Sequence, residues 1–343
     1  MPDALQPSAD DRAAHLRWLL HLTQLPTAAG REHHVIEWIT RWAAQRPLVA
    51  VTSDAGGVMD AYFTDASVML HSAPGPVRAR LTGRQPQAAA SDLFPIYTAV
   101  TESPHHAAPG DVAVWDVPPA EVTDGRVHTL ACDDLAALAA ALAAFDALLR
   151  RPPTECVRLL LTRAEEVGFV GAIGACRHST IPRGARLIAL ENSRAFADSP
   201  LGGGPIVRVG DRLSIFSPGL TAAIAKRAEE HAAANPGWKW QRKLMAGGAC
   251  EASVFCQAGF EATCVCLPLG NYHNMGDLDA VQAGTNATPP RVAREYIATS
   301  DFEGLVDLLI ACGERLGAGP SLAERFDKLW EQRRVILGPQ PRA

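Results

Sequence analysis

The chain has 343 residues, of which 48% are hydrophobic and 20% are charged, so it can bury a large core and is not generally disordered. This length allows one large domain or two smaller ones. Acidic residues outnumber basic ones, 37 against 32. That mild negative charge argues against nucleic acid as a partner, because phosphate binding needs clustered positive charge.

The sequence has no stretch of 18 consecutive apolar residues, so we expect neither a transmembrane helix nor a membrane partner. Its first twenty residues carry early acidic groups and no apolar run before a small-residue cleavage site, so we expect no secretory signal. The eight cysteines are scattered and form no Cys-x-x-Cys pair. This pattern favours reduced, buried cysteines in a cytoplasmic protein.

The first part of the chain reads as two amphipathic helices followed by two short strands. In chain order, we predict helices at 12–23 and 31–45 and strands at 47–51 and 67–71. A Pro- and Gly-rich stretch after His71 then marks a boundary.

Residues 76–128 differ in composition from the rest of the chain. Strand-like pieces such as 77–81 and 111–115 alternate with turns, and helical periodicity is absent. We therefore predict a small β-rich domain at 76–128, inserted into a discontinuous catalytic domain formed by 1–75 and 129–343.

After the insertion, helices alternate with short apolar runs. We predict helices at 133–150, 165–176, 220–233, 251–257 and 302–315, strands at 156–162, 186–190 and 262–267, and a last helix after Pro320. This rhythm is typical of an α/β fold in which helices cover both faces of a central sheet.

Acidic residues or a histidine follow four apolar, strand-like runs. The motifs are Asp133-Asp134, Glu165-Glu166, Glu191 and His273. Each alone has a structural explanation, such as an N-cap or an acidic first helical turn. Ligands of α/β sheets bind where strands end, however, and oxygen and imidazole donors together suit a two-metal hydrolytic site.

Several motifs also occur in a family-like order: Leu25-Pro26-Thr27-Ala28-Ala29-Gly30-Arg31-Glu32, then Asp54-Ala55-Gly56-Gly57, Asp133-Asp134, Glu165-Glu166-Val167-Gly168-Phe169-Val170-Gly171-Ala172, Leu201-Gly202-Gly203-Gly204-Pro205, Gly247-Gly248-Ala249-Cys250-Glu251-Ala252 and Tyr272-His273. With them the chain resembles the tetrahedral-aminopeptidase family of dinuclear zinc metallopeptidases, also called the glutamyl aminopeptidase family, within the co-catalytic zinc exopeptidase clan. The resemblance spans roughly residues 16–316, and it implies a central mixed β-sheet covered by helices on both faces.

The resemblance also implies roles for individual residues. Asp133 would bridge two metal ions, Glu166 and His273 would complete the site of one ion, and Glu191 would bind the other. Glu165 would be the general base that takes a proton from the attacking water.

One expected motif departs from the family. The family has His-x-Asp at the end of an early strand, and here His71 can occupy the histidine position while Ala73 stands where the aspartate belongs. We predict His71 as a metal ligand, and the alternative is an ordinary histidine at a strand end. Without the aspartate, the imidazole would be less firmly oriented.

The function that the resemblance implies is a cytoplasmic, homo-oligomeric aminopeptidase that cleaves short peptides with two divalent metal ions, with zinc expected and cobalt or manganese as alternatives. A carboxypeptidase or N-acyl amidohydrolase of the same clan is a second interpretation. A catalytically impaired relative that serves as a binding or structural subunit is a third.

Overall fold

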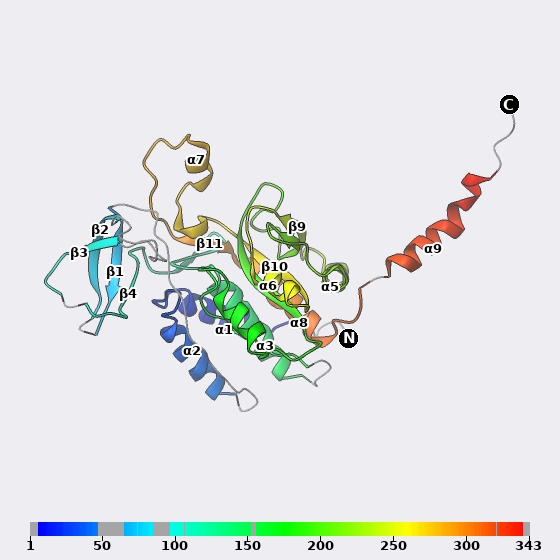
Figure 1. The fold of residues 1–343 in the computed structure, drawn as a ribbon, viewed down its shortest axis with the longest axis horizontal. Coiled ribbons are helices and arrows are strands. Elements are labelled where there is room, and N and C mark those ends of the chain that lie inside the picture. The colour runs from blue at the N-terminus through cyan, green and yellow to red at the C-terminus, as the bar shows by residue number, and fades with distance from the viewer. Residues whose placement is uncertain are drawn as a thin grey trace.

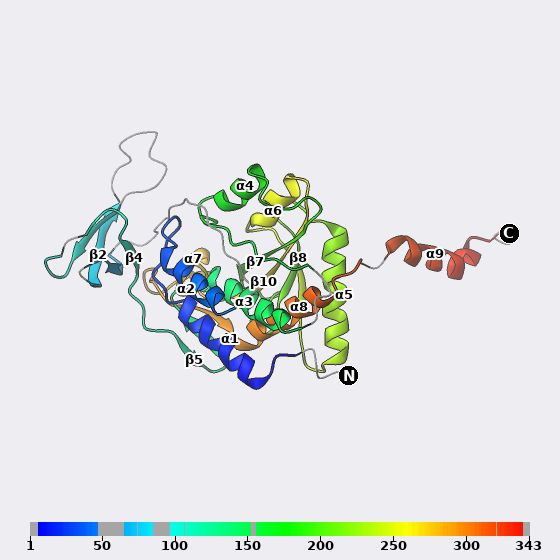
Figure 2. The ribbon, with the colours of Figure 1, turned by 90° about the horizontal axis from the view of Figure 1, so that it is seen from below.

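The computed structural model describes residues 6–46, 65–73, 75–84, 97–105, 107–151, 156–319 and 321–338. A four-stranded mixed sheet lies at the centre of its larger part (Figures 1 and 2). Its strands, in spatial order, are β7 (Arg186–Arg194), β10 (Glu261–Leu269), β8 (Ile206–Asp211) and β9 (Gln241–Met245). β10 runs parallel to β7 and antiparallel to β8, and β9 runs parallel to β8. The predicted α/β fold with a central mixed sheet is confirmed.

In chain order, the helices of the described residues are α1 (Ala9–Leu22), α2 (His33–Ala44), α3 (Leu135–Leu149), α4 (Val170–Arg177), α5 (Pro218–Ala234), α6 (Glu251–Gln257), η1 (Tyr272–Asn274), α7 (Leu278–Ala283), α8 (Thr299–Glu314), α9 (Leu322–Arg333) and η2 (Arg334–Leu337). Most predicted helices form close to their expected bounds. The helix predicted at 165–176 begins only at Val170, which leaves Glu165 and Glu166 in the turn ahead of it.

Helices cover both faces of the central sheet because β10 points its buried side chains alternately to each face. Val265, Leu267 and Leu269 share one core cluster with residues of α3 and α8. Cys264 and Cys266 belong to a second cluster that includes part of α6. Figure 2 shows α4 and α6 on one side of β7 and β10, with α3 and α8 on the other.

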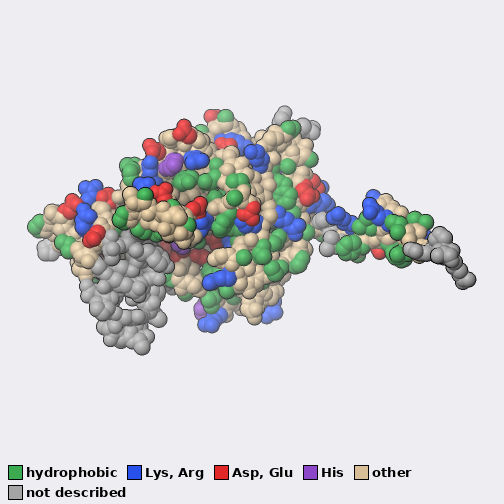
Figure 3. Space-filling model, turned by 90° about the horizontal axis from the view of Figure 1, so that it is seen from above, with side chains coloured by type: hydrophobic (Ala, Val, Ile, Leu, Met, Phe, Trp, Pro, Cys, Tyr) green, Lys and Arg blue, Asp and Glu red, His purple; other side chains and the backbone are tan. Residues whose placement is uncertain are grey.

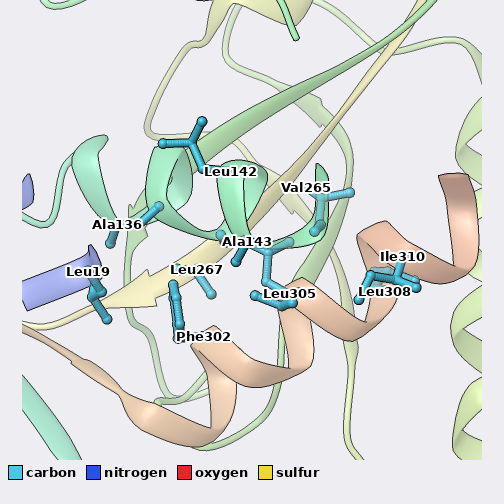
Figure 4. Packing of buried hydrophobic residues seen from close by; sticks show 14 of the residues in the cluster. Leu19, Ala136, Leu142, Ala143, Val265, Leu267, Phe302, Leu305, Leu308 and Ile310 are labelled. Carbon is cyan, nitrogen blue, oxygen red and sulfur yellow. The ribbon is translucent and has the colours of Figure 1, made fainter. Parts of the chain in front are cut away.

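Small residues allow the close contact between α3 and α8. A Cβ atom at Gly313 of α8 would lie 2.3 Å from Leu148 Cδ1 of α3, so a larger residue would force the Leu148 side chain to shift. In Figure 4, Ala143 of α3, Leu305 of α8 and Leu267 of β10 meet in this cluster. This packed layer fixes the N-terminal end of α3, beside which the candidate site is built.

A separate antiparallel sheet lies to one side of the molecule in Figure 1. Its spatial order is β3 (Tyr97–Thr101), β2 (Val77–Arg84), β1 (Ser67–His71) and β4 (Val112–Trp115). The strand predicted at 67–71 forms, but it pairs with β2 and β4. This small sheet therefore begins ahead of the predicted boundary at residue 76, because strand periodicity says nothing of which partner a strand will take.

The other end of the predicted insertion also differs from expectation. β5 (Glu121–Thr123) and β6 (Arg126–Thr129) form a three-stranded antiparallel sheet with β11 (Glu295–Ala298), far along the chain. This pairing ties residues 121–129 to the larger part of the molecule, directly ahead of Asp133.

The strand predicted at 156–162 does not form, and that prediction was wrong. Val157, Leu160 and Leu161 are 36% to 40% exposed, and the run has no strand partner among the described residues. An apolar run becomes a strand only where a neighbour offers its hydrogen-bonding edge. The strand predicted at 47–51 and the motif at 54–57 lie outside the described residues.

The helix predicted after Pro320 forms as α9. It extends away from the rest of the molecule in Figures 1 and 2. Ser321 caps it by accepting the Glu324 N–H at 3.2 Å. Phe326 and Trp330 are exposed on α9, whose hydrophobic side chains are visible in Figure 3. Within the described ranges, no helix combines the length and the apolar character needed to cross a bilayer.

Candidate metal centre

Three carboxylates meet between the start of α3 and strand β7. One oxygen each from Asp133, Asp134 and Glu191 lies within 4.8 Å of the others, close enough to bind a shared metal ion. The two aspartates, joined by a cis peptide bond, follow β6 and lead into α3, whereas Glu191 lies inside β7. Asp134 Oδ1 accepts a 2.7 Å hydrogen bond from the Asn192 N–H, which ties the two segments together beside the group.

Glu165 and Glu166 lie in a turn whose glycines have structural reasons. Gly168 has a φ of +106°, a conformation that residues with a Cβ atom rarely adopt. A Cβ atom at Gly171 would lie 2.5 Å from the backbone N and O of Arg163, so glycine is needed for α4 to approach this closely. The glycines of the Glu-Glu-Val-Gly-Phe-Val-Gly motif therefore shape the segment that carries the two glutamates.

A residue from the first motif holds the same segment. Glu32 Oε1 accepts the N–H groups of Gly30 at 2.6 Å and of Ala164 at 3.2 Å, and its Oε2 lies 2.7 Å from Arg163 Nη2. The motifs at the two glutamates and at 25–32, which are distant in the sequence, thus meet in the structure. The contact fixes the backbone one residue ahead of Glu165.

The crowding of buried carboxylates changes their protonation. Burial, and then the charges of neighbouring carboxylates with Asp134 first, raise the pKa of Asp133 well above its usual value. Burial and Asp134 raise the pKa of Glu166 to about 7, and the same causes together with Glu166 raise that of Glu165 to about 10. Without a cation, several of these groups are therefore protonated near neutral pH. A bound cation would favour their charged forms.

His273 reaches the same group from the segment that follows β10. Its Nε2 atom lies 3.8 Å from Asp133 Oδ2. Its ring stacks on that of Tyr272, with the ring centroids 3.9 Å apart. Burial lowers the pKa of His273, which favours the neutral imidazole that metal ions bind.

A buried guanidinium also faces the carboxylates. Arg208 of β8 places Nη1 3.5 Å from Glu191 Oε2. Burial raises the pKa of Glu191, and the charge of Arg208 opposes that rise. Nothing in the sequence points to a role for Arg208, because an arginine inside a strand gives no sign of what it faces across the sheet.

The structure does not bring His71 to this group. His71 ends β1 in the small sheet, and after burial the group that lowers its pKa is His34 of α2 rather than a carboxylate partner. Among the described residues, the group of potential metal ligands consists of the two aspartates and Glu191, and His71, Glu166 and His273 are not in it.

From the sequence, Asp134 has no role beyond that of its motif, since the resemblance assigns only Asp133. Asp134 occupies the N-cap position of α3, but its side chain makes no capping hydrogen bond and lies in the carboxylate group. The signal available was the acidic pair itself, since one capping carboxylate is enough for a helix.

The residues present fit a divalent cation. Asp133 Oδ1 is buried and has no hydrogen-bond partner, a costly state for a carboxylate oxygen unless a cation satisfies it. Carboxylate oxygens together with an imidazole form a donor set that suits zinc, cobalt and manganese. Asp133, Glu166, Glu191 and His273 are the residues that would hold such ions, with Asp134 beside them in the same group.

Comparison with known proteins gives a family match. The family model for the M42 glutamyl aminopeptidases matches residues 92–286, more than half of the chain. No curated protein matches the chain significantly.

Solved structures resemble the chain in fold. The TET1 peptidase of Pyrococcus horikoshii, solved as a dodecamer, is 20% identical, with 88% of this chain and 99% of that chain covered and a TM-score of 0.66. An aminopeptidase from the archaeon Desulfurococcus kamchatkensis is 18% identical, with 90% and 96% covered and a TM-score of 0.69. A TET aminopeptidase from a marine sediment thaumarchaeote is 17% identical, with 88% and 97% covered and a TM-score of 0.67. At these identities, the likeness shows the fold alone.

Proposed function

Because the chain belongs to the M42 glutamyl aminopeptidase family and is a peptidase, we propose that it removes N-terminal residues from short peptides with the help of two divalent metal ions. The observation that carries this proposal is the group of Asp133, Asp134 and Glu191, with His273 beside it. Zinc is the ion we propose, and cobalt or manganese could replace it at such donors.

In the proposed ligand set, Asp133 is shared between the two ions. Glu166 and His273 complete the site of one ion, and Glu191 serves the other. The position of Asp133 between these groups supports the assignment, since its pKa is raised by both glutamates and its Oδ2 lies 3.8 Å from His273 Nε2. His71 does not enter the set, because it lies in the small sheet.

A bound divalent ion would polarise the scissile carbonyl and make water more acidic. Glu165 is the proposed general base, because it stands next to the proposed ligand Glu166 and is itself assigned no metal bond. Its carboxylate takes the proton of the attacking water and then gives that proton to the nitrogen of the departing amine. The hold of Glu32 on Ala164 keeps the backbone ahead of Glu165 in place for both transfers.

The match to the glutamyl aminopeptidase family favours an aminopeptidase over a carboxypeptidase. The runner-up interpretation, an impaired peptidase that acts as a binding subunit, draws its support from the position of His71, which ends β1 in the small sheet.

We also propose a cytoplasmic homo-oligomer. Support comes from relatives of the same fold, one solved as a dodecamer and described as assembling into a tetrahedron or a large octahedral shell. Light scattering on the purified chain tests the assembly, and a monomer mass at all concentrations would contradict it.

The activity test uses the full-length chain stripped with a chelator and then reloaded with zinc, cobalt or manganese. We expect metal-dependent release of N-terminal residues from unblocked short peptides and little from N-acetylated copies. Cleavage of the acetylated peptides alone would favour an amidohydrolase, and release from the C-terminus a carboxypeptidase. Metal uptake without any hydrolysis would favour the impaired binding subunit.

A further inference from the structure

Glu295, which no motif singles out, accepts hydrogen bonds from the backbone that leads to Asp133. Its Oε2 accepts the Cys132 N–H at 2.6 Å and the Asp133 N–H at 3.2 Å. The register of β11 explains the contact, since Glu295 pairs with Thr129 at the end of β6, just ahead of these N–H groups. The side chain is 2% exposed, so few water molecules compete for these bonds.

The same carboxylate reaches the histidine segment. The backbone N–H of Asn274, the residue after His273, also interacts with Glu295 and opposes the rise in its pKa that burial causes. The Asn274 side chain then links both partners, because its Nδ2 donates to Leu130 O at 2.8 Å and to Ala293 O at 3.0 Å. Two neighbouring side chains thus join the segment of Asp133, the segment of His273 and the start of β11.

We propose that Glu295 is a positioning residue of the metal centre, whose single carboxylate sets the backbone beside both Asp133 and His273. The proposal rests on the proposed metal-dependent function. Asp133 and His273, which carry the two ligand segments, are 140 residues apart in the sequence. A carboxylate that binds both fixes the separation of their donor atoms before an ion arrives, and such supporting contacts are typically worth about 10–100-fold in metal affinity.

The chain contains a second buried carboxylate that serves as a matched control for Glu295. Asp301 of α8 is also a buried carboxylate that accepts two backbone N–H groups, those of Gly202 at 2.8 Å and Gly204 at 2.7 Å. It braces the loop after β7 and makes no described contact with Asp133 or His273. Loss of this bracing should cost stability without changing the spacing of the metal ligands.

The test is calorimetric titration of the metal-free, full-length chain with zinc chloride, for the wild type, Glu295→Gln and Asp301→Asn. Glutamine keeps the shape of the side chain but cannot ionise and has one acceptor oxygen instead of two. We expect metal affinity to fall about 10–100-fold in Glu295→Gln and by less than about 3-fold in Asp301→Asn. Circular dichroism should show both variants folded.

Equal zinc affinity in Glu295→Gln and the wild type would overturn the proposal, as would equal losses in the two variants. If Glu295→Gln does not fold, Glu295→Asp, which withdraws the carboxylate by one methylene, is titrated instead and judged by the same criterion. A wild-type chain that binds no zinc would overturn this inference. A chain that binds zinc but hydrolyses no peptide would overturn only the proposed function, because the titration needs no turnover.

Discussion

Arg208 Nη1 lies 3.5 Å from Glu191 Oε2, and the two side chains are only 2% and 10% exposed. A pair buried this deeply pays a large desolvation cost, which the mutual attraction of the charges must offset. The finding also bears on metal binding, because Glu191 faces a fixed cation where it is proposed to serve an ion.

Replacing Arg208 with methionine should therefore destabilise the metal-free protein by about 3–5 kcal/mol at a pH high enough to ionise Glu191, since it leaves a buried carboxylate without its partner. Urea denaturation measures this loss. Arg41→Met is the control, because Arg41 pairs with Glu37 on the exposed face of α2 and its loss should cost less than about 1 kcal/mol. Equally small losses in both variants would show that Arg208 is not needed to balance Glu191.

Glu165→Gln should lower kcat by about 10²- to 10⁴-fold, the contribution typical of a positioned general base. Metal content should stay at the wild-type level, because Glu165 is outside the proposed ligand group. Turnover and metal analysis of the same sample check both statements. Near-full activity would remove Glu165 from the base assignment, and loss of metal would make it a ligand instead.

The stability of the metal-free protein should fall as the pH rises from about 4.5 to 7. Burial is the main cause that raises the pKa of Glu166 and of Glu251 from 4.5 to about 7, so the folded chain binds these protons more strongly than the unfolded chain. The stabilisation is complete below the unfolded pKa and is lost as pH passes the folded one. Thermal unfolding with a chelator should show this decline. Saturating zinc should reduce it, and a rise in Tm across the same range without metal would contradict the account.

Glu32→Gln should lower kcat by up to about 100-fold with little change in KM, because small displacements of a reacting group cost rate rather than binding. The substitution removes the ion pair with Arg163 and weakens the hold on Ala164, next to Glu165. Steady-state kinetics measures the effect. Glu37→Gln, on the exposed face of the same region, should behave as the wild type, and equal behaviour of the two variants would deny Glu32 this role.

A chain that stops after Gly319 should unfold within about 1–2 °C of the full chain, because α9 stands clear of the core in Figures 1 and 2. It should also be more soluble, since it lacks the exposed Phe326 and Trp330. Differential scanning calorimetry at matched oligomeric state makes the comparison. A large fall in Tm would mean that α9 packs on the protein in solution.

Helices and the acidic motifs could be predicted because their signals are local. α6 forms at Glu251–Gln257, as the sequence predicts, and Asp133 and Glu191 do meet. Which strands pair with one another, across long sequence separations, could not be predicted. The run at 156–162 has no strand partner within the described ranges, and the strand that ends at His71 joined the small sheet.

Glu295 shows why such features escape sequence reading. It stands 162 residues from Asp133, between an arginine and a tyrosine, and only the pairing of β11 with β6 brings the two together. Arg208 is similar, because its partner Glu191 lies two strands away, across β10. The partners of such side chains can be predicted only after the order of the strands in the sheet is known.

The central claim, that these carboxylates and His273 form a metal centre, is tested most directly by titrating metal-free wild type and Asp133→Asn with zinc in a calorimeter. The account predicts one tightly bound ion in the wild type and a second, weaker one, because Glu191 is shared with Arg208 and His71 lies elsewhere. Asp133→Asn should lose both, since the proposed shared ligand is gone. Wild-type affinity in Asp133→Asn, or no binding by the wild type, would contradict the claim.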